Sequence, residues 1–221
     1  MLVVKKFVFN MFSVNTYVIW DESTKECLII DPGCCNLKEE QEITKYIEAN
    51  GLRLLYLLNT HCHVDHLMGC NFIKDSFRPQ YFVPEKDVDL LEHASDQATA
   101  FGYEIKPPPL PDKLISRNTS LTIGISPVTF LFTPGHTAGE YCFYFAKESF
   151  CITGDVLFKK SIGRTDLWGG DYATLITSIR TELLSLPDNV MIYPGHGESS
   201  RIGLEKSENP FLHEANKKYN Q

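Results

Sequence analysis

The feature that most constrains this chain is a cluster of metal-binding residue types directly after an apolar run. The run Leu52–Asn59 predicts a buried strand, and His61, His63, Asp65 and His66 follow it at once. Residues i and i+2 of an extended segment lie on the same face, so the first two histidines can grip one ion. The aspartate and the third histidine then turn away to start the next helix. This spacing predicts one loop that provides two sets of metal ligands.

Three further motifs place metal-binding residue types after apolar, strand-like runs. His136 lies in Thr-Pro-Gly-His-Thr, Asp155 in Thr-Gly-Asp, and His196 in Tyr-Pro-Gly-His-Gly. Glycine and proline beside them suit a backbone that turns sharply toward a bound group. One Pro-Gly-His alone would be an ordinary turn, but two copies beside the first motif favour a shared site. The remaining His93 and His213 fit ordinary surface positions.

With these motifs the chain resembles the metallo-β-lactamase superfamily, and within it the glyoxalase II (hydroxyacylglutathione hydrolase) branch in its short form. The resemblance spans nearly the whole chain. It implies an α/β fold, a four-layer αββα sandwich with the metals at one edge between the two sheets. It also implies two ligand sets that share one residue: His61, His63 and His136 for one metal, Asp65, His66 and His196 for the other, and Asp155 bridging both.

Two divalent ions would make a nucleophile without a dedicated basic side chain. Ions roughly 3.5–4 Å apart lower the pKa of a shared water toward neutrality and polarise the carbonyl that it attacks. Asp65 is the expected catalytic residue, because a free carboxylate oxygen can orient the hydroxide or relay its proton. Zinc is the expected metal, and iron and manganese suit the same ligands. Asp31, at a predicted strand end, is the expected acceptor for a ligand histidine.

Other catalytic motifs do not occur in the sequence. It has no Gly-x-Ser-x-Gly elbow, no Walker phosphate loop, no Cys-x-x-Cys and no Gly-x-Gly-x-x-Gly. The seven cysteines are odd in number, and several lie in apolar runs, which predicts buried thiols in a reducing cytoplasm. Cys62 lies between two ligand histidines and could hold zinc as a thiolate, but alternation points its side chain away from theirs.

Composition agrees with one compact enzyme domain. We expect a single domain over residues 1–221, with a short C-terminal tail over residues 204–221. No apolar run approaches the ~20 residues of a membrane span, so a membrane partner is not expected. A formal charge of −7 without basic clusters disfavours nucleic acid as a partner. The expected partner is a small-molecule thioester, and the oligomeric state stays open.

Periodicity predicts layered α/β structure. Short strands are expected between residues 2 and 30 and near residues 120, 130, 143 and 152. Prolines at positions 107–109 and 111 forbid regular structure there. The expected helices are Leu37–Asn50, a helix after Asp65, about Glu85–Phe101, and the amphipathic Asp171–Leu186. This mixture of helices and strands favours the layered fold that the resemblance implies.

The resemblance implies hydrolysis of a thioester such as S-lactoylglutathione by a metal-bridging hydroxide. Full-length relatives hold glutathione with basic and tyrosine side chains and a C-terminal helical domain, which the short spacing after His196 predicts to be missing. Arg164 stands in the place of the family's lysine, whereas Asp166 and Glu198 stand where tyrosines are expected. Arg164 is therefore the candidate substrate-binding residue. An exposed loop cation paired with Asp166 is the equal alternative.

A second reading of the chain stays open. The Gly-Arg-Thr-Asp element at residues 163–166 also occurs in persulfide dioxygenases of the superfamily, which use one iron, two histidines and an aspartate to oxidise glutathione persulfide. The Tyr-Pro-Gly-His-Gly motif and the Asn-Pro-Phe tail at residues 209–211 are of the short hydrolase type. They favour hydrolysis over the dioxygenase. A metal-binding module without catalysis is a third reading, which the intact ligand set disfavours.

Overall fold

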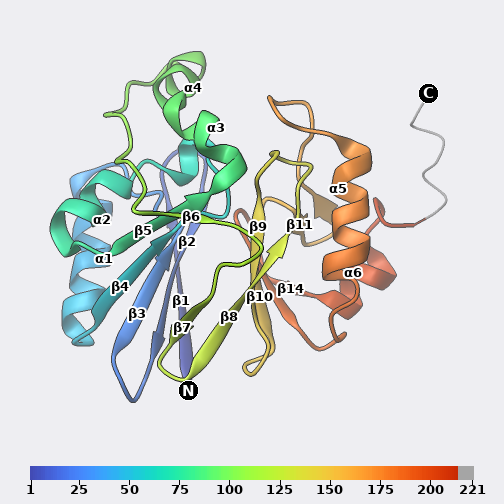
Figure 1. Ribbon diagram of the computed structural model, residues 1–221, viewed down its shortest axis with the longest axis horizontal. Helices are drawn as coiled ribbons and strands as arrows, with labels where there is room; N and C mark the ends of the chain where they lie inside the picture. The colour runs from blue at the N-terminus through green and yellow to red at the C-terminus, as the bar shows by residue number, and fades with distance from the viewer. Residues whose placement is uncertain (214–221) are drawn as a thin grey trace.

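Two β-sheets pack face to face, with helices on both outer sides (Figure 1), in the computed structural model, which describes residues 1–213. The first sheet has the strand order β1-β2-β3-β4-β5-β6. Its strands are β1 (Leu2–Phe9), β2 (Val14–Asp21), β3 (Glu26–Ile30), β4 (Arg53–Leu58), β5 (Gln80–Pro84) and β6 (Lys113–Ile115). Strands β1 to β3 pair antiparallel, and β3 to β6 pair parallel. The parallel strands need crossover connections, which helices provide.

The second sheet has the order β14-β13-β10-β9-β8-β7. Its strands are β7 (Leu121–Ile123), β8 (Ser126–Phe132), β9 (Tyr141–Phe145), β10 (Phe150–Gly154), β13 (Met191–Pro194) and β14 (Ser200–Arg201). Only the pair β10 and β13 is parallel within it. A separate two-stranded ribbon of β11 (Leu157–Phe158) and β12 (Ser161–Ile162) lies between β10 and the next helix along the chain.

Helices cover the outer face of each sheet. The long helices on the first sheet are α1 (Leu37–Ala49) and α2 (Cys70–Phe77), and those on the second are α5 (Tyr172–Ser178) and α6 (Ile202–Glu208) (Figure 1). The side chain of Asn36 starts α1 by accepting from the backbone N–H groups of Lys38 and Glu39. Within residues 1–213, none of the helices is both long enough and apolar enough to cross a membrane.

Three apolar clusters fill the spaces between four layers. Along β3, Cys27 and Ile29 pack toward α1 and α2, while Leu28 and Ile30 pack between the sheets. The same alternation recurs on β9 and β10, whose opposite faces contact the sheet interface and helix α5. Strands with both faces buried read as continuous apolar runs, which explains the sequence pattern. The predicted four-layer αββα sandwich is confirmed.

Two predicted helices are interrupted in the structure. The stretch Glu85–Phe101 is not one helix but three short ones, η2 (Glu85–Asp87), α3 (Val88–Glu92) and α4 (Ala94–Ala100). His93, with φ −95° and ψ 17°, separates the last two, because its backbone leaves the helical region. The late helix ends its α-helical part at Ser178 and continues as the π-helical turn η3 (Ile179–Leu183).

The predicted C-terminal tail begins inside α6. Asn209 anchors the chain after this helix, because its amide donates to the Ser161 carbonyl and to the Glu205 carboxylate. This contact ties the chain after α6 to strand β12 of the ribbon. The remainder of the tail, residues 214–221, lies outside the described residues.

Candidate metal centre

Strand ends from both sheets deliver the candidate ligands to one place. β4 leads into His61, β8 into His136, β10 into Asp155 and β13 into His196, as the sequence predicts. The short helix η1 (Val64–His66) then redirects the chain after β4, so that the aspartate and third histidine of the first motif face inward. Residues far apart in the sequence thus meet because strand ends from both sheets converge there.

The glycine before His196 is required by a close approach. A Cβ atom on Gly195 would clash with Oδ1 of Asp155 and would lie 2.8 Å from Cε1 of His66. The Gly195 N–H donates to the Gly154 carbonyl at 2.6 Å, which ties the ends of β13 and β10 together. Only glycine lets these two strand ends bring their ligands so close.

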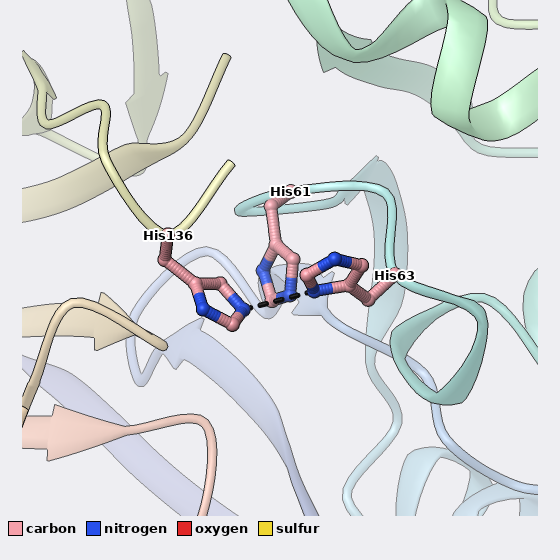
Figure 2. A group of neighbouring side chains, drawn as sticks. All are labelled: His61, His63 and His136. Atoms are coloured by element: carbon pink, nitrogen blue, oxygen red, sulfur yellow. Dashed lines mark hydrogen bonds between the residues drawn. The ribbon is translucent and has the colours of Figure 1, made fainter. Parts of the chain in front are cut away.

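The first predicted ligand set forms a compact group. One nitrogen from each of His61, His63 and His136 lies within 4.8 Å of the others. Figure 2 shows the three rings pointing toward one another, with Nδ1 of His63 and Nε2 of His136 only 2.9 Å apart. Nε2 of His61 is buried and has no hydrogen-bond partner within residues 1–213. Three imidazoles arranged in this way offer three ligand nitrogens to one ion.

The second predicted set also comes together. Asp65, His66 and His196 each offer an atom within 4.8 Å of the others. Oδ2 of Asp65 lies 3.3 Å from Nε2 of His196 and 3.6 Å from Nε2 of His66. This group combines one carboxylate with two imidazoles, so its character differs from that of the all-histidine group.

Asp155 lies between the two groups. Its Oδ2 is 3.6 Å from Nε2 of His136 and 3.5 Å from Nε2 of His196, while its Oδ1 is 3.6 Å from Nε2 of His66. Its backbone N–H donates to the Glu140 carboxylate at 2.7 Å, which fixes the start of the loop. The carboxylate therefore reaches ring nitrogens of both sets.

The ring nitrogens on the far side of four histidines have their own partners. Such partners fix a ring's orientation and leave its other nitrogen for a metal. The contacts are His66 Nδ1 to Asp31 Oδ2 (3.1 Å), His136 Nδ1 to the Arg164 carbonyl (2.7 Å), His196 Nδ1 to the Phe12 carbonyl (3.0 Å) and His61 Nδ1 to Thr60 Oγ1 (3.0 Å). Asp31, singled out by sequence for such a contact, lies behind His66, a candidate ligand.

Two buried acids at the centre escaped sequence reasoning. The Glu140 carboxylate is fully buried, 3.4 Å from Nδ1 of His61, and burial raises its pKa well above the usual value. The Asp87 carboxylate accepts from the Cys62 N–H and the Thr137 hydroxyl, and burial raises its pKa to about 6. The only sequence signal for Glu140 is an acid directly before the apolar strand β9.

Protonation differs between the two groups. Burial lowers the pKa of His63 to about 3 and that of His136 to about 4, and it lowers that of His61 as well. These histidines are therefore neutral near pH 7, which is the form that binds a metal. Burial also acts to lower the pKa of His66, but the carboxylates of Asp65 and Asp155 outweigh it and raise that pKa to about 10.

The donor set fits divalent metal ions. Nε2 of His61, Nε2 of His66 and Oδ1 of Asp155 are all buried without a hydrogen-bond partner among the described residues. A buried polar atom left unpaired costs about 1–3 kcal/mol, and a bound cation would offset this cost. Imidazole nitrogens and carboxylate oxygens are also the ligand types that zinc, iron and manganese accept.

Other residues weighed from the sequence lie outside the two groups. The Cys62 side chain is buried in the apolar cluster beneath the first sheet and belongs to no ligand group of residues 1–213. His93 and His213 are likewise absent from those groups. Arg164 lies at the rim, where its guanidinium binds the Asp166 carboxylate with two contacts of 2.7 and 2.8 Å.

A cleft of about 570 Å³ opens over the centre. Five candidate ligands reach its floor: His63, Asp65, His136, Asp155 and His196. Access of this kind distinguishes a catalytic metal site from a closed structural one, because a substrate can approach the metals. The cleft also explains why the side chains of Asp65 and His196 stay partly exposed while that of His61 is fully buried.

A family model for the metallo-beta-lactamase superfamily matches residues 10–196 of the chain, which include every candidate ligand. The chain belongs to this superfamily. The curated hydroxyacylglutathione hydrolase GloC of Haemophilus influenzae is 40% identical over 204 residues, covering 91% of this chain and 93% of GloC. The chain is thus similar to the branch that its motifs indicate.

Two solved structures show the same fold. The B3 metallo-beta-lactamase BLEG-1 superposes with a TM-score of 0.87 at 34% identity, covering 95% of this chain and 99% of that one. TTHA1623, crystallised in a di-iron-bound form, superposes with a TM-score of 0.84 at 32% identity, covering 95% of this chain and all of the other. Proteins with this fold thus carry names of different activities, and one of them was crystallised with two irons.

Proposed function

We propose that this chain is a dinuclear-metal hydrolase that cleaves a thioester, with S-lactoylglutathione as the first substrate to test. The observation that carries the proposal is Asp155, whose two oxygens face ring nitrogens of both ligand groups. The assigned ligands are His61, His63 and His136 for one ion, Asp65, His66 and His196 for the other, and Asp155 for both. Zinc is the proposed metal, because five of the seven assigned ligands are imidazoles.

Bound ions would supply a hydroxide nucleophile near neutral pH and polarise the substrate carbonyl. Burial opposes ionisation of Asp65, but the neighbouring His66 and His196 lower its pKa well below the usual range, so it remains a carboxylate. We assign to it the proton that the attacking water loses as its oxygen bonds to the carbonyl carbon. As the C–S bond breaks, the same carboxylate returns this proton to the leaving thiolate, giving an acid and a thiol.

The choice of a thioester rests on similarity to GloC, a hydroxyacylglutathione hydrolase by name. Arg164 lines the cleft and is the proposed contact for a carboxylate of a glutathione-derived substrate. Its ion pair with Asp166 supports the alternative, structural role equally well. Because all seven cysteines are free and six of them are buried, we also place the protein in the reducing cytoplasm.

A persulfide dioxygenase is the second candidate function. The group His61, His66 and Asp155 offers two histidines and one aspartate within 4.8 Å, which is the ligand composition of a mononuclear iron site. That reading leaves four side chains that face the same centre without a task, namely His63, Asp65, His136 and His196. The two-metal hydrolase accounts for all seven side chains.

Thioester hydrolysis and oxygen uptake, measured on the same purified protein, separate the two functions. S-lactoylglutathione is supplied anaerobically and in air, and glutathione persulfide is supplied in air with an oxygen electrode. We expect thioester cleavage at equal rates with and without oxygen, and no oxygen uptake on the persulfide. Oxygen uptake without thioester cleavage would overturn the proposal in favour of the dioxygenase.

A further inference from the structure

The walls of the cleft above the candidate metals are apolar. Four aromatic side chains line it, and they come from four separate segments: Phe12, Phe101, Phe158 and Trp168. Aliphatic residues fill the remaining wall, among them Leu90 and Leu167. Among the described residues that line the cleft, Arg164 is the one positively charged side chain apart from the candidate ligands.

The polar groups of the wall already have partners inside the protein. The Gln97 amide accepts from the Val64 N–H at 3.1 Å and donates to the Leu90 carbonyl at 2.7 Å. Arg164 shares two contacts with Asp166, as described above. Glutathione carries two carboxylates, and its recognition would need cations that are free to pair with them. Within residues 1–213, this cleft offers a single cation besides the candidate ligands, and that cation already pairs with an anion.

Two aromatic rings at the cleft mouth are unusually exposed. Phe101 is 46% and Trp168 is 60% exposed. Each is nevertheless held in place: Phe101 packs edge-on against Phe12 at 5.5 Å, and Trp168 packs against His93 at 5.7 Å. In Figure 1, α4 and the segment that leads into α5 lie at the same end of the molecule. Exposed aromatic surface beside a cleft marks a place where an apolar ligand binds.

From this wall we infer that the substrate carries an aromatic or long aliphatic group next to its scissile carbonyl, taken up between Trp168 and the pair Phe12 and Phe101. The inference deepens the proposed function and rests on it. A small lactoyl group would leave the aromatic rings uncovered, whereas a phenyl ring would bury apolar surface against them. The apolar group belongs either to the acyl part or to the thiol part of the thioester.

Three thioesters test the inference and separate these two sources. S-lactoylglutathione is the reference, S-mandeloylglutathione replaces its methyl group by phenyl on the acyl side, and the lactoyl thioester of benzyl mercaptan places the ring on the thiol side. We expect kcat/KM for at least one phenyl-bearing substrate to exceed the reference by about tenfold or more. The better of the two identifies which part of the substrate meets the aromatic wall.

Substitutions of Phe101 and Trp168 test whether these aromatic rings cause any preference for phenyl-bearing thioesters. Phe101→Ala and Trp168→Ala should each bring the ratio of kcat/KM values, phenyl-bearing over reference, toward one, and Trp168→Phe should restore most of it. Phe211→Ala is the matched control, because Phe211 is 41% exposed and does not line the cleft. It should keep the wild-type ratio.

The outcomes distinguish failure of the inference from failure of the proposed function. Equal or lower kcat/KM for both phenyl-bearing thioesters would overturn the inference and leave the thioester hydrolase standing. A preference that survives both alanine variants would also overturn it, because the wall would not be its cause. Turnover of none of the three thioesters would contradict the proposed function and the inference together.

Discussion

The floor and the wall of the cleft differ in how firmly the protein fixes them. At the floor, seven candidate ligands converge from four strand ends, and five of them line the cleft. Most of the ring nitrogens contact either a partner behind the ring or another candidate ligand. On the wall, Phe101, Arg164 and Trp168 lie on a helix end and a loop and are about half exposed. The proposed metal chemistry therefore depends on residues at the strand ends of the two sheets. The proposed substrate selectivity depends on a helix end and a loop, which can vary without disturbing the fold.

The largest effect is expected at the residue shared by both ligand groups. Asp155→Asn removes the negative charge that faces His66, His136 and His196, so metal content and thioester hydrolysis should fall together, with kcat/KM reduced at least about a thousandfold. Metal analysis and kinetics on the same sample provide the measurement. Asp75→Asn, an exposed surface change, is the control. An Asp155→Asn enzyme that keeps both metals and full activity would break the two-metal assignment.

Asp65→Ala should come next in size. This residue is proposed to handle the proton of the attacking water, so kcat should fall about a hundredfold or more while KM changes far less. Steady-state kinetics at saturating metal separates the two constants. An effect confined to KM would contradict the assigned role and would indicate that Asp65 contributes to substrate binding instead of proton transfer.

The buried histidines of the candidate metal centre should contribute less stability to the metal-free protein at acidic pH. The pKa values of His63 and His136, about 3 and 4 in the fold, lie below the ordinary value of 6.5, so below about pH 6.5 the unfolded chain binds more protons than the native one. The free energy of unfolding should then fall by on the order of 2 kcal/mol per histidine between about pH 7 and 5. His66 does not add to this decrease in the free energy of unfolding. Its pKa is raised in the fold, so between about pH 7 and 5 it binds at least as many protons in the native state as in the unfolded state.

Urea unfolding of chelator-treated protein at several pH values measures this loss. The histidine contribution should decrease as the pH is lowered, whereas the raised pKa values of Glu140 and Asp87 act in the opposite direction, so the wild type is compared with His63→Gln. Saturating zinc should shift the histidine-dependent decrease to lower pH because the metal competes with protons. An identical pH dependence of the metal-free wild type and His63→Gln would mean that this histidine is not held neutral by burial.

Glu140→Gln should have an intermediate effect. The carboxylate lies behind His61 and also receives the Asp155 N–H, and the isosteric amide retains an acceptor for that N–H. Loss of a partner behind a ligand lowers metal affinity or activity by about tenfold to a hundredfold. A zinc titration against a competing chelator measures the affinity. Unchanged affinity would show that Glu140 serves packing alone.

The smallest effect is expected on the wall. Because Asp166 already occupies the Arg164 guanidinium, Arg164→Ala should raise KM for S-lactoylglutathione only a few-fold and leave kcat unchanged. Lys159→Ala is the matched control, since this exposed cation pairs with Glu198 and does not line the cleft. An increase of KM beyond about tenfold, for glutathione thioesters and not for neutral ones, would favour the carboxylate contact over the structural pairing with Asp166.

Local sequence patterns predicted the candidate ligands far better than the buried residues that contact them from behind. The spacing of His61, His63, Asp65 and His66 and the glycines after three strands are features of short segments. Apolar periodicity indicated only layered α/β structure, and the four-layer sandwich was implied by the resemblance to the metallo-β-lactamase superfamily. Glu140 escaped prediction because its contacts with His61 and Asp155 depend on how β9 pairs with β10.

The residues of the cleft wall were also harder to predict, because they too depend on contacts between distant parts of the sequence. Phe12 packs against Phe101 across a long separation in sequence, and nothing in either neighbourhood indicates the other. The helix expected over Glu85–Phe101 has the right residues but breaks at His93, which frees α4 to take its own direction at the cleft mouth. Periodicity detects the helical character of such a segment but not a change of axis within it.

The count of metal ions per chain tests the central claim most directly. Purified protein, loaded separately with zinc, iron and manganese and freed of loosely bound metal, is analysed by mass spectrometry of the intact folded chain. The account predicts two ions per chain in the wild type and fewer than two in Asp155→Asn. A wild-type protein that saturates at one ion would contradict the two-metal centre and favour the mononuclear iron alternative.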